Sequence, residues 1–560
     1  MALDTSSQQA AWHPLLTIAD VTVGGTPAQT VRWSDADLSM SDGTLYTNRI
    51  KSVSPLRQEL GRLLETQFVL SDLKIELDNA DDAVRDILTN NANLAGKATT
   101  LDMGQGQDVT VYERRFTGEI RQPDGVYWDD KIATLTFDDA LEADAVTLPV
   151  NSIWPSTYPN AEAKSKYHAI PEVLGDFRTT AGGGETVPGF CVDTTVGTGG
   201  QFTFGQHLEA LEAVYLNGVA TSYTTNQLTG PSLVTLDVAY APLTDAVSAN
   251  VNGRATTNAG AYPAAENVPT AWAYDILTAS WGMNLSSSTR VDTTTFNATY
   301  AASYYGAGDK CRRWVGSDIQ AVTLLAELGL DGFFELFIEK GGKWKPVFRL
   351  ASSALATTVI RKADLIPTAD GGRVFAVQSD AERTYANQIV YDYRYRPPEW
   401  DGETLSAVTD YAASGQVDDA AEKTTVGRTV RRRIKLRWLY ETTGADDRGY
   451  RDLYVFGKRL ELPMIDIGPA GLGLERADTF QLLYSKYALS GTAGTPCMVR
   501  SIDPDYRRMR VRVTAWNIDR LSPRRYQADG SAAWAAATTY DKSVMGYHGA
   551  FSGDDEQLYM

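Results

Sequence analysis

The sequence is poor in the residues that metal and nucleophile chemistry use. Its 560 residues include four histidines and three cysteines, at His13, His168, His207 and His548 and at Cys191, Cys311 and Cys497. The histidines are too far apart along the chain to form a metal motif, and the three scattered cysteines give neither a zinc motif nor a disulfide framework. The zinc motif HExxH, the phosphate loop GxxxxGK[ST] and the nucleophile elbow GxSxG are absent. We therefore expect no metal, no cofactor and no catalytic residues.

Long apolar runs are also lacking. No stretch approaches the 18 or so apolar residues that a membrane-spanning helix needs. The first residues, MALDTSSQQAAWHP, lack the basic region and apolar core of a signal peptide. We expect a soluble protein, made in a reducing compartment, with no membrane span. The formal net charge of −18 argues against a general nucleic-acid binder but leaves room for a local basic face.

The residues that are present favour β structure. Tyrosine (28) and glycine (47) are frequent, and apolar and polar side chains alternate in segments such as LKIELDN at 73–79. Hairpin turns are expected at Gly24-Gly25, Asn217-Gly218 and Gly341-Gly342, each between apolar runs. Another hairpin is expected to turn at Asp503-Pro504-Asp505.

Helical spacing is confined to a few segments. Residues 269–282 have Pro269 in the first turn, Gly282 at the end and apolar residues between them. Residues 317–329 repeat apolar side chains at helical intervals, with Ser317 as the expected N-cap. A short amphipathic helix or a turn is expected at 81–90, and a further helix at 446–461.

The order of these elements predicts a mainly β, multidomain protein. Its length suggests three or four domains at about 150 residues each. We expect two β-barrel-like domains flanking a mixed α+β insertion. The predicted division is an N-terminal arm (1–15), a first β-barrel-like domain (16–150), a loop-rich β region (151–265), an α+β inserted domain (266–380), a second β-barrel-like domain (381–526) and a C-terminal tail (527–560).

A weak internal echo connects the two β blocks. Residues 116–144 and 498–520 both contain a strand, a polar turn with Asp and Pro, a second alternating strand and an acidic exit. Either chance or a pair of related β-barrels would produce this echo, because hairpins are common.

The order of motifs resembles a known family. Four stretches carry the resemblance: HAIPEVLGDFRTTAGGGETVPGFCVD together with EAVYLNG, VPTAWAYDILTASWGMNLSSSTRVDTTTF, SDIQAVTLLAELGLDGFFELFIEKGGKWKPVF and ADTFQLLYSKYALSGTAGTPCMVRSIDPDYRRMRVRVTA. Their order is similar to that in the central hub proteins of phage tail tips and baseplates. In that family a β-barrel precedes an inserted domain with a helix and a Gly-Lys hairpin, and a second barrel follows. The resemblance covers most of residues 15–525 and lies in order, not in one diagnostic motif.

The resemblance implies a structural role without catalysis. Such hubs are homotrimers whose two barrels per chain form a pseudo-sixfold ring between the sixfold tail tube and a threefold tip. The ring surrounds the channel for DNA or the tape-measure protein. Its implied partners are the distal tail ring protein and spike or fibre proteins, with transient DNA in the lumen. The implied location is the virion, at the tail tip or baseplate, after synthesis in the host cytoplasm.

Two basic stretches are candidate contact sites. Cationic residues alternate with other residues in each, at Arg431, Arg433, Lys435 and Arg437 and at Arg508, Arg510 and Arg512. Alternate residues of a strand share one face. Each face would meet an acidic neighbouring subunit or DNA in a lumen. The alternative is a solvated face that protects a strand edge from aggregation.

Other candidate sites are weaker. Trp534, Tyr540 and Tyr547 in the tail resemble the start of small chitin-binding modules and would stack on sugar rings, whereas a docked or disordered tail is the alternative. The carboxylate pairs at 129–130, 138–139, 418–419 and 554–555 are interpreted as turn or surface residues. The alternative functions are a carbohydrate-binding or carbohydrate-cleaving tail protein and a secreted β-rich adhesin, which the missing signal peptide disfavours.

Overall fold

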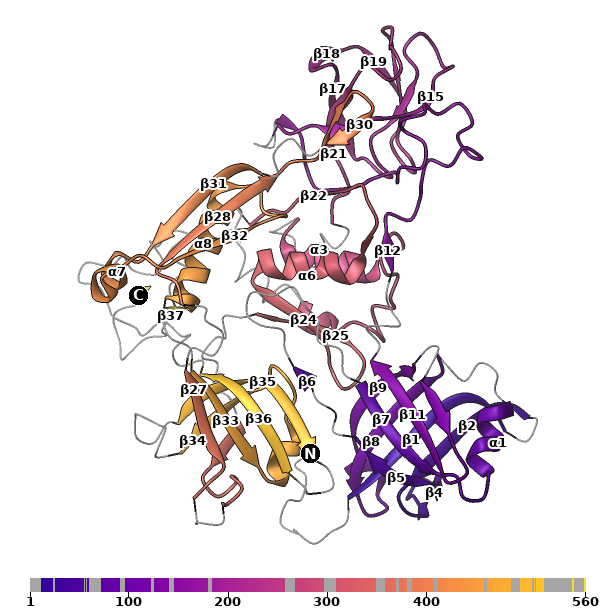
Figure 1. Cartoon of the computed structure of the whole chain (residues 1–560), viewed down its shortest axis with the longest axis vertical. Coiled ribbons are helices and arrows are strands. Elements are labelled where there is room, and N and C mark those ends of the chain that lie inside the picture. Colours follow the sequence, from indigo (N-terminus) through magenta and orange to yellow (C-terminus); the bar gives the residue numbers. More distant parts are fainter. Residues whose placement is uncertain are drawn as a thin grey trace.

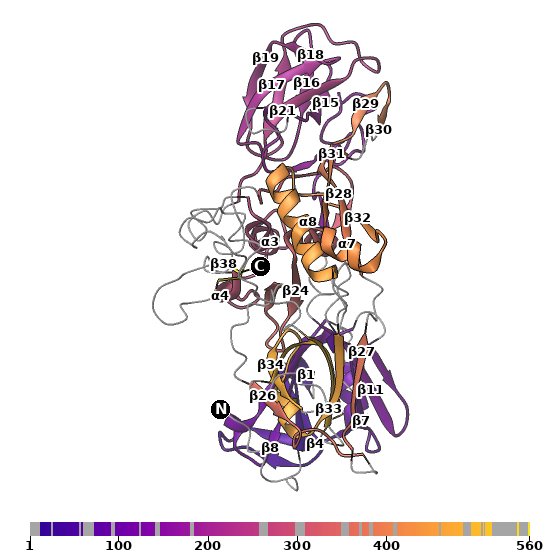
Figure 2. The ribbon, with the colours of Figure 1, turned by 90° about the vertical axis from the view of Figure 1, so that its left-hand side faces the viewer.

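The computed structural model gives a fold that is mainly β, as the sequence predicts. The structure describes residues 12–23, 26–54, 56, 58–59, 72–90, 96–121, 125–139, 146–179, 184–256, 267–296, 309–348, 358–368, 372–379, 385–406, 411–457, 461–484, 494–505, 508, 510–517, 546–547 and 558–559. Figures 1 and 2 show an elongated molecule with two β domains side by side at one end, a mixed region in the middle and a third β region at the other end.

The first β domain is a ten-stranded curved sheet. Its strands are β1 (Trp12–Val23), β2 (Thr26–Ser34), β3 (Leu38–Ser39), β4 (Leu45–Asn48), β5 (Ile50–Val53), β7 (Asp72–Asp78), β8 (Ala98–Gln105), β9 (Glu113–Ile120), β10 (Val126–Trp128) and β11 (Ile132–Asp139), accompanied by α1 (Ala83–Asn90) and the 3₁₀ turn η1 (Val109–Val111). They follow the order β3-β4-β2-β1-β8-β9-β11-β7-β5, with β10 beside β11. Alternate side chains such as Leu73, Ile75 and Leu77 are fully buried in the core.

Among the described residues, the strand pairs of the first β domain do not close into a ring, so they form a curved sheet in place of a closed barrel. Arg49 nevertheless joins β4, next to one end of the sheet, to β5 at the other end. The Arg49 N–H donates to the Ser34 carbonyl of β2 at 2.7 Å, and the Arg49 carbonyl accepts from the Asp78 N–H of β7 at 2.6 Å. One backbone segment between β4 and β5 therefore hydrogen-bonds to both β2 and β7.

The second β domain is a seven-stranded sheet. It comprises β26 (Thr358–Arg361), β27 (Phe375–Ser379), β33 (Glu461–Ile467), β34 (Thr479–Leu483), β35 (Thr495–Asp505) and β36 (Arg510–Asn517), with β6 (Gln58–Glu59) beside β35 and the 3₁₀ turn η3 (Pro469–Gly473) packed on it. β26 and β27 fall within 358–379, which the sequence places in the inserted domain. They belong to this sheet because β26 pairs with β34 and β27 pairs with β33. The exact domain edges stay a prediction.

The two β domains share one strand order. The second sheet runs β26-β34-β35-β36-β33-β27, and the first contains the path β1-β8-β9-β11-β7-β5. If the six strands of each path are numbered by their order in the sequence, both sheets have the spatial order 1-4-5-6-3-2. The strand pairs of the sequence echo, β9–β11 and β35–β36, occupy the same positions. One pair differs in direction, since β26 and β34 are parallel whereas β1 and β8 are antiparallel.

The middle region packs helices and a small sheet around one core. It contains β12 (Thr147–Leu148), α3 (Pro269–Thr278), α4 (Thr293–Phe296), β23 (Ile319–Gln320), α6 (Ala321–Gly332), β24 (Phe334–Ile338), β25 (Trp344–Phe348), β28 (Gln388–Tyr395), β31 (Tyr411–Asp418), α7 (Ala420–Val426), β32 (Arg431–Lys435) and α8 (Thr442–Phe456). The sheet order is β31-β28-β32, and α8 contacts β28 and β31. Trp272, Leu325 and Trp438 are buried together, so the segments around 270, 325 and 390–456 fold as one unit.

The third β region lies at the far end. Its elements are β13 (Glu172–Leu174), β14 (Val187–Pro188), β15 (Phe190–Asp193), β16 (Gln201–Thr203), β17 (Ala210–Leu216), β18 (Val219–Thr221), β19 (Tyr223–Gln227), β20 (Leu233–Leu236), β21 (Val247–Asn252) and β22 (Arg313–Val315). Two four-stranded sheets enclose an apolar core. A hairpin of β29 (Glu399–Asp401) and β30 (Thr404–Ser406) docks there through Trp400, whose indole N–H donates to the Gly189 carbonyl at 2.7 Å.

Most local predictions hold, and two are wrong. The hairpins at Asn217-Gly218 and Gly341-Gly342 are confirmed. The helix predicted from Ser317 begins at Ala321, because residues 319–320 are extended and pair with β12. The turn predicted at 503–505 is instead the end of β35, where Asp503 and Asp505 lie opposite Arg512 and Arg510 of β36. The predicted hairpin itself is confirmed, because β35 and β36 pair antiparallel, and only its turn lies later, after Asp505.

The remaining helices lie close to their predictions. Helix α3 confirms the helix expected from Pro269 but ends at Thr278, and α8 runs from Thr442 to Phe456, four to five residues before the range expected. Helix α1 confirms the helix expected near 81–90. Gly24 and Gly25 lie outside the described residues, although β1 and β2 pair on either side of them. Across the described part of the chain, no helix has the length and apolar character needed to cross a membrane.

Candidate assembly surfaces

A seam joins the two β domains. After β5 the chain leaves the first β domain and places β6 against β35, where Glu59 pairs with Ser501 and Gln58 with Ile502. β34 pairs with residues 495–498 of β35, whereas β6 pairs with residues 501–502, beyond a bulge in β35. The first domain therefore completes the sheet of the second with two residues of backbone.

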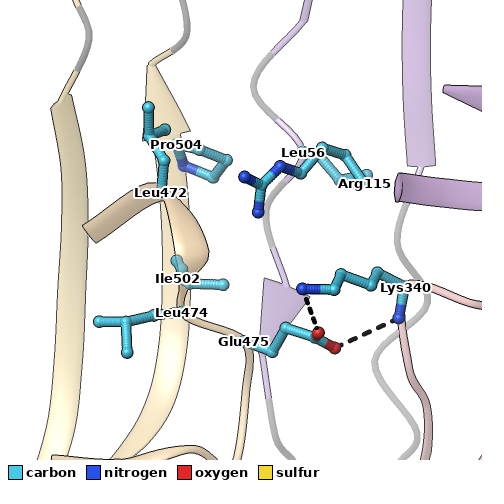
Figure 3. Close-up of a pocket in the computed structure, with 8 residues that line it drawn as sticks. All are labelled: Leu56, Arg115, Lys340, Leu472, Leu474, Glu475, Ile502 and Pro504. Atoms are coloured by element: carbon cyan, nitrogen blue, oxygen red, sulfur yellow. Dashed lines mark hydrogen bonds and ion pairs between the residues drawn. The ribbon is translucent and has the colours of Figure 1, made fainter. Parts of the chain in front are cut away.

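The tip of the β24–β25 hairpin reinforces this seam. The Lys340 ammonium contacts a Glu475 carboxylate oxygen at 2.7 Å, and the Lys340 carbonyl accepts from the Thr117 hydroxyl at 3.0 Å. The hairpin thus binds both β domains at once. A small pocket remains between the three parts, lined by Leu56, Arg115, Lys340, Leu472, Leu474, Glu475, Ile502 and Pro504. Figure 3 shows the Arg115 guanidinium pointing from the first domain toward the apolar residues of the second.

The first predicted basic face lies on β32, and we call it the β32 stripe: Arg431, Arg433, Lys435 and Arg437. All four residues are exposed, whereas Ile434, Leu436 and Trp438 between them are buried, so the predicted alternation is confirmed. β32 is an edge strand, paired among the described residues only with β28. Two of the cations also hold carboxylates: Arg433 binds Asp392 through two bonds of 2.7 Å, and Arg437 binds Glu327 at 2.5 Å.

The second predicted basic face lies at β36 and is largely neutralised. Arg512 binds Asp466 at 3.0 Å, Arg510 approaches the same carboxylate at 3.8 Å, and Arg508 lies 3.8 Å from Asp505. Asp466 is buried, and its interaction raises the pKa of Arg512. These three arginines therefore balance local carboxylates, which the sequence did not show because Asp466 lies on another strand.

The two β domains differ strongly in charge. Residues 12–139 contain 21 Asp and Glu against 12 Lys and Arg, a net of −9. Residues 358–379 and 461–517 together contain 8 Asp and Glu against 10 Lys and Arg, a net of +2. Sheets with the same strand order thus carry opposite net charges, which favours contact between unlike domains and opposes contact between two copies of the first.

Part of the negative charge gathers at one end of the first β domain, which we call the acidic rim: Asp35, Asp37, Leu45, Asp42, Asp108 and Val109. Its loops touch, because the Ser41 N–H donates to the Gln107 carbonyl at 2.8 Å. Hydrogen bonds from Thr44 and Thr110 lower the pKa values of Asp42 and Asp108, so both stay ionised. Leu45 and Val109 are 68% and 38% exposed. Sequence reasoning missed the rim because its parts are 60 or more residues apart.

Buried charges also tie α8 to α6. Asp331, at the end of α6, accepts the Trp438 N–H at 2.6 Å, and burial raises its pKa to about 7. Arg448 and Asp452 of α8 are fully buried and form an ion pair, and the Arg448 Nε–H donates to the Leu330 carbonyl at 2.9 Å. Nothing in the sequence pattern distinguishes these residues from ordinary surface charges on an amphipathic helix.

Several other candidates have simple structural roles or cannot be placed. Asp129 accepts two backbone N–H groups of its own turn, and Asp419 caps α7. Trp534 and Tyr540 lie outside the described residues. Tyr547 lies on the short strand β37 (Gly546–Tyr547), which pairs with β38 (Leu558–Tyr559). The three cysteines are buried thiols, and the described residues include no group of three His, Cys, Asp or Glu that could hold a metal ion.

Comparison with known proteins gives matches only among solved structures. No protein-family model and no curated protein matches the chain. The 43 kDa tail protein of prophage MuSo2 from Shewanella oneidensis matches over 91% of this chain and 100% of its own, with 12% identity and a TM-score of 0.39. A tail protein from Neisseria meningitidis MC58 matches over 90% and 96%, with 7% identity and a TM-score of 0.39. A chain of a native gene transfer agent virion matches over 57% and 77%, with 12% identity and a TM-score of 0.34.

Proposed function

We propose that this chain is a structural hub protein of a phage tail tip or baseplate. Three copies would form a ring that joins the tail tube to spike or fibre proteins. The observation that carries the proposal is the shared strand order of the two β domains in one chain. Three chains would then contribute six units of similar fold, which suits an adaptor between a sixfold tube and a threefold tip.

The seam supports this role. A ring of alternating domains needs a fixed relation between the two domains of each chain, and β6 with the β24–β25 hairpin provides one. The proposed partners are the distal tail ring protein on the tube side, spike or fibre proteins on the other side, and the tape-measure protein and transient DNA in the lumen. The proposed location is the virion, after synthesis in the host cytoplasm. The role involves no catalysis.

The oligomeric state tests the proposal. Light scattering after size-exclusion chromatography should give three times the chain mass of 61.1 kDa, and negative-stain images should show threefold rings. A chain that stays monomeric at tens of micromolar, with or without a tail-tube protein, would refute the hub.

A second candidate is contact with carbohydrate on the host surface. One observation favours it: Trp154 and Tyr167 are 54% and 67% exposed, and their rings meet edge to face at 5.8 Å. Tyr167 holds a left-handed backbone (φ 67°), which is costly for a large side chain. A glycan array probed with the wild type and with Trp154→Ala tests this candidate, and identical binding profiles would exclude the site.

A further inference from the structure

The β32 stripe is open to a partner. In the part of the chain that the structure describes, β32 is the edge of its sheet, and α8 packs on this sheet through β28 and β31. Alternate residues of a strand lie about 6.7 Å apart, so Arg431, Arg433 and Lys435 extend over roughly 13 Å along β32, and Arg437 follows two residues after the strand ends. The side chain of Arg433 is 67% exposed even while it binds Asp392. The stripe therefore presents positive charge to solvent along a regular line.

The acidic rim has the complementary properties. It combines four exposed aspartates with two exposed apolar side chains, Leu45 and Val109. Charged and apolar groups together on one rigid surface are typical of protein interfaces. The loop contact between Ser41 and Gln107 holds the two parts of the rim in place.

The two surfaces lie apart within one chain. Figures 1 and 2 show β4, at the rim, low in the first β domain, and β32 in the middle region above the second β domain. A contact between them must therefore join two copies and use a different patch on each. Such heterologous contacts repeat from copy to copy and close into a ring when the rotation allows.

We infer that the β32 stripe of one copy binds the acidic rim of the next copy. This inference rests on the proposed ring and names the surfaces that hold it together. A second copy is favoured over DNA as the partner because the chain itself supplies the acidic surface, on a domain of net charge −9. The chain's overall charge of −18 opposes a polyanion such as DNA.

The chain offers a matched control. The test variant is Arg431→Gln with Arg433→Gln and Lys435→Gln, and the control is Arg508→Gln with Arg510→Gln and Arg512→Gln. Each removes three cations from alternating positions, and each leaves one buried carboxylate without its arginine, Asp392 or Asp466. Sedimentation velocity over a dilution series measures assembly, and thermal unfolding of each monomer confirms the fold.

The expected result is a selective loss of assembly. The test variant should raise the dissociation concentration of the oligomer about tenfold or more at low salt, and the control should leave it within about twofold. The rim variant Asp35→Asn with Asp42→Asn and Asp108→Asn should match the test variant, since asparagine keeps the local hydrogen-bond acceptors. Combining rim and stripe variants should add little, because both remove the same interaction.

The outcomes separate this inference from the proposed function. A trimeric wild type whose stripe variant assembles normally, or whose control variant weakens equally, would overturn the inference and leave the hub standing. If the stripe variant assembles normally but binds a duplex DNA probe less tightly than the wild type, the inference would also be overturned. The stripe would then be a nucleic-acid-binding surface. A wild-type protein that stays monomeric would refute both the proposed hub function and this inference.

Discussion

Trp400 provides the sharpest test of how the parts of the chain hold together. It lies on β29, more than 200 residues from its partner Gly189, and is 8% exposed. Its ring packs edge to face against Phe190 at 5.4 Å and His168 at 5.7 Å, and the Lys164 ammonium lies 5.3 Å from its centre. Replacement of a buried tryptophan by alanine costs about 3–5 kcal/mol. Trp400→Ala should therefore release the β29–β30 hairpin from the third β region.

A second substitution separates packing from hydrogen bonding. Trp400→Phe keeps much of the apolar contact and leaves the Gly189 carbonyl without its donor, which costs about 1–3 kcal/mol. Trp154→Ala is the control, since that side chain is more than half exposed and its loss should change stability by about 0.5 kcal/mol or less. Hydrogen exchange over 187–193 and 399–406 is the assay, because local opening need not follow global unfolding. Exchange in Trp400→Ala no faster than in Trp154→Ala would contradict the proposed anchoring, and so would a larger effect of phenylalanine than of alanine.

Two further substitutions test other contacts. Folding raises the pKa of Asp331 from 3.8 to about 7, so the wild type loses stability as the pH rises between these two values. Asp331→Asn should therefore gain stability relative to the wild type between pH 3.8 and about 7, and the difference should stay constant above that range. Urea unfolding at several pH values measures this difference, and a difference that does not change with pH would contradict the raised pKa. Gly342→Ala should lower stability by about 1–2 kcal/mol in thermal unfolding, because Gly342 has a left-handed φ of 80° and a Cβ there would lie 2.9 Å from Thr117 Cγ2. Gly341→Ala is its control, with a nearest contact of 3.3 Å to a flexible Glu339 side chain, and equal losses would contradict the argument.

Features that depend on neighbouring residues could be predicted from the sequence. Asn217 and Gly218 adopt φ values of 51° and 78°, as a two-residue hairpin turn requires, and asparagine and glycine are the residues that tolerate such angles. The β32 alternation is equally local, because strand geometry alone sends every second side chain to one face. Even the echo between 116–144 and 498–520 corresponds to strand pairs at equal places in the two sheets.

Features that depend on residues far apart in the sequence could not be predicted. β6 is a strand only because β35 offers it an open stretch of edge, and two residues carry no periodic signal. Whether Arg512 forms a basic face or an ion pair depends on Asp466, which β33 brings beside it from 46 residues away. The sheet positions of β26 and β27 are equally distant in origin, since their partners β34 and β33 follow the whole middle region along the chain.

The difference in charge between the two β domains has a physical explanation within the shared fold. Each sheet is held by the inward side chains of alternating strands, such as Leu73, Ile75 and Leu77 in one and Val511, Val513 and Ala515 in the other. The outward positions of these strands are constrained far less by packing. Two domains with one strand order can therefore keep their cores and change their surface charges independently. In the proposed ring, the acidic first domain of one copy would therefore attract less acidic parts of the next copy, and two copies of the first domain would repel each other.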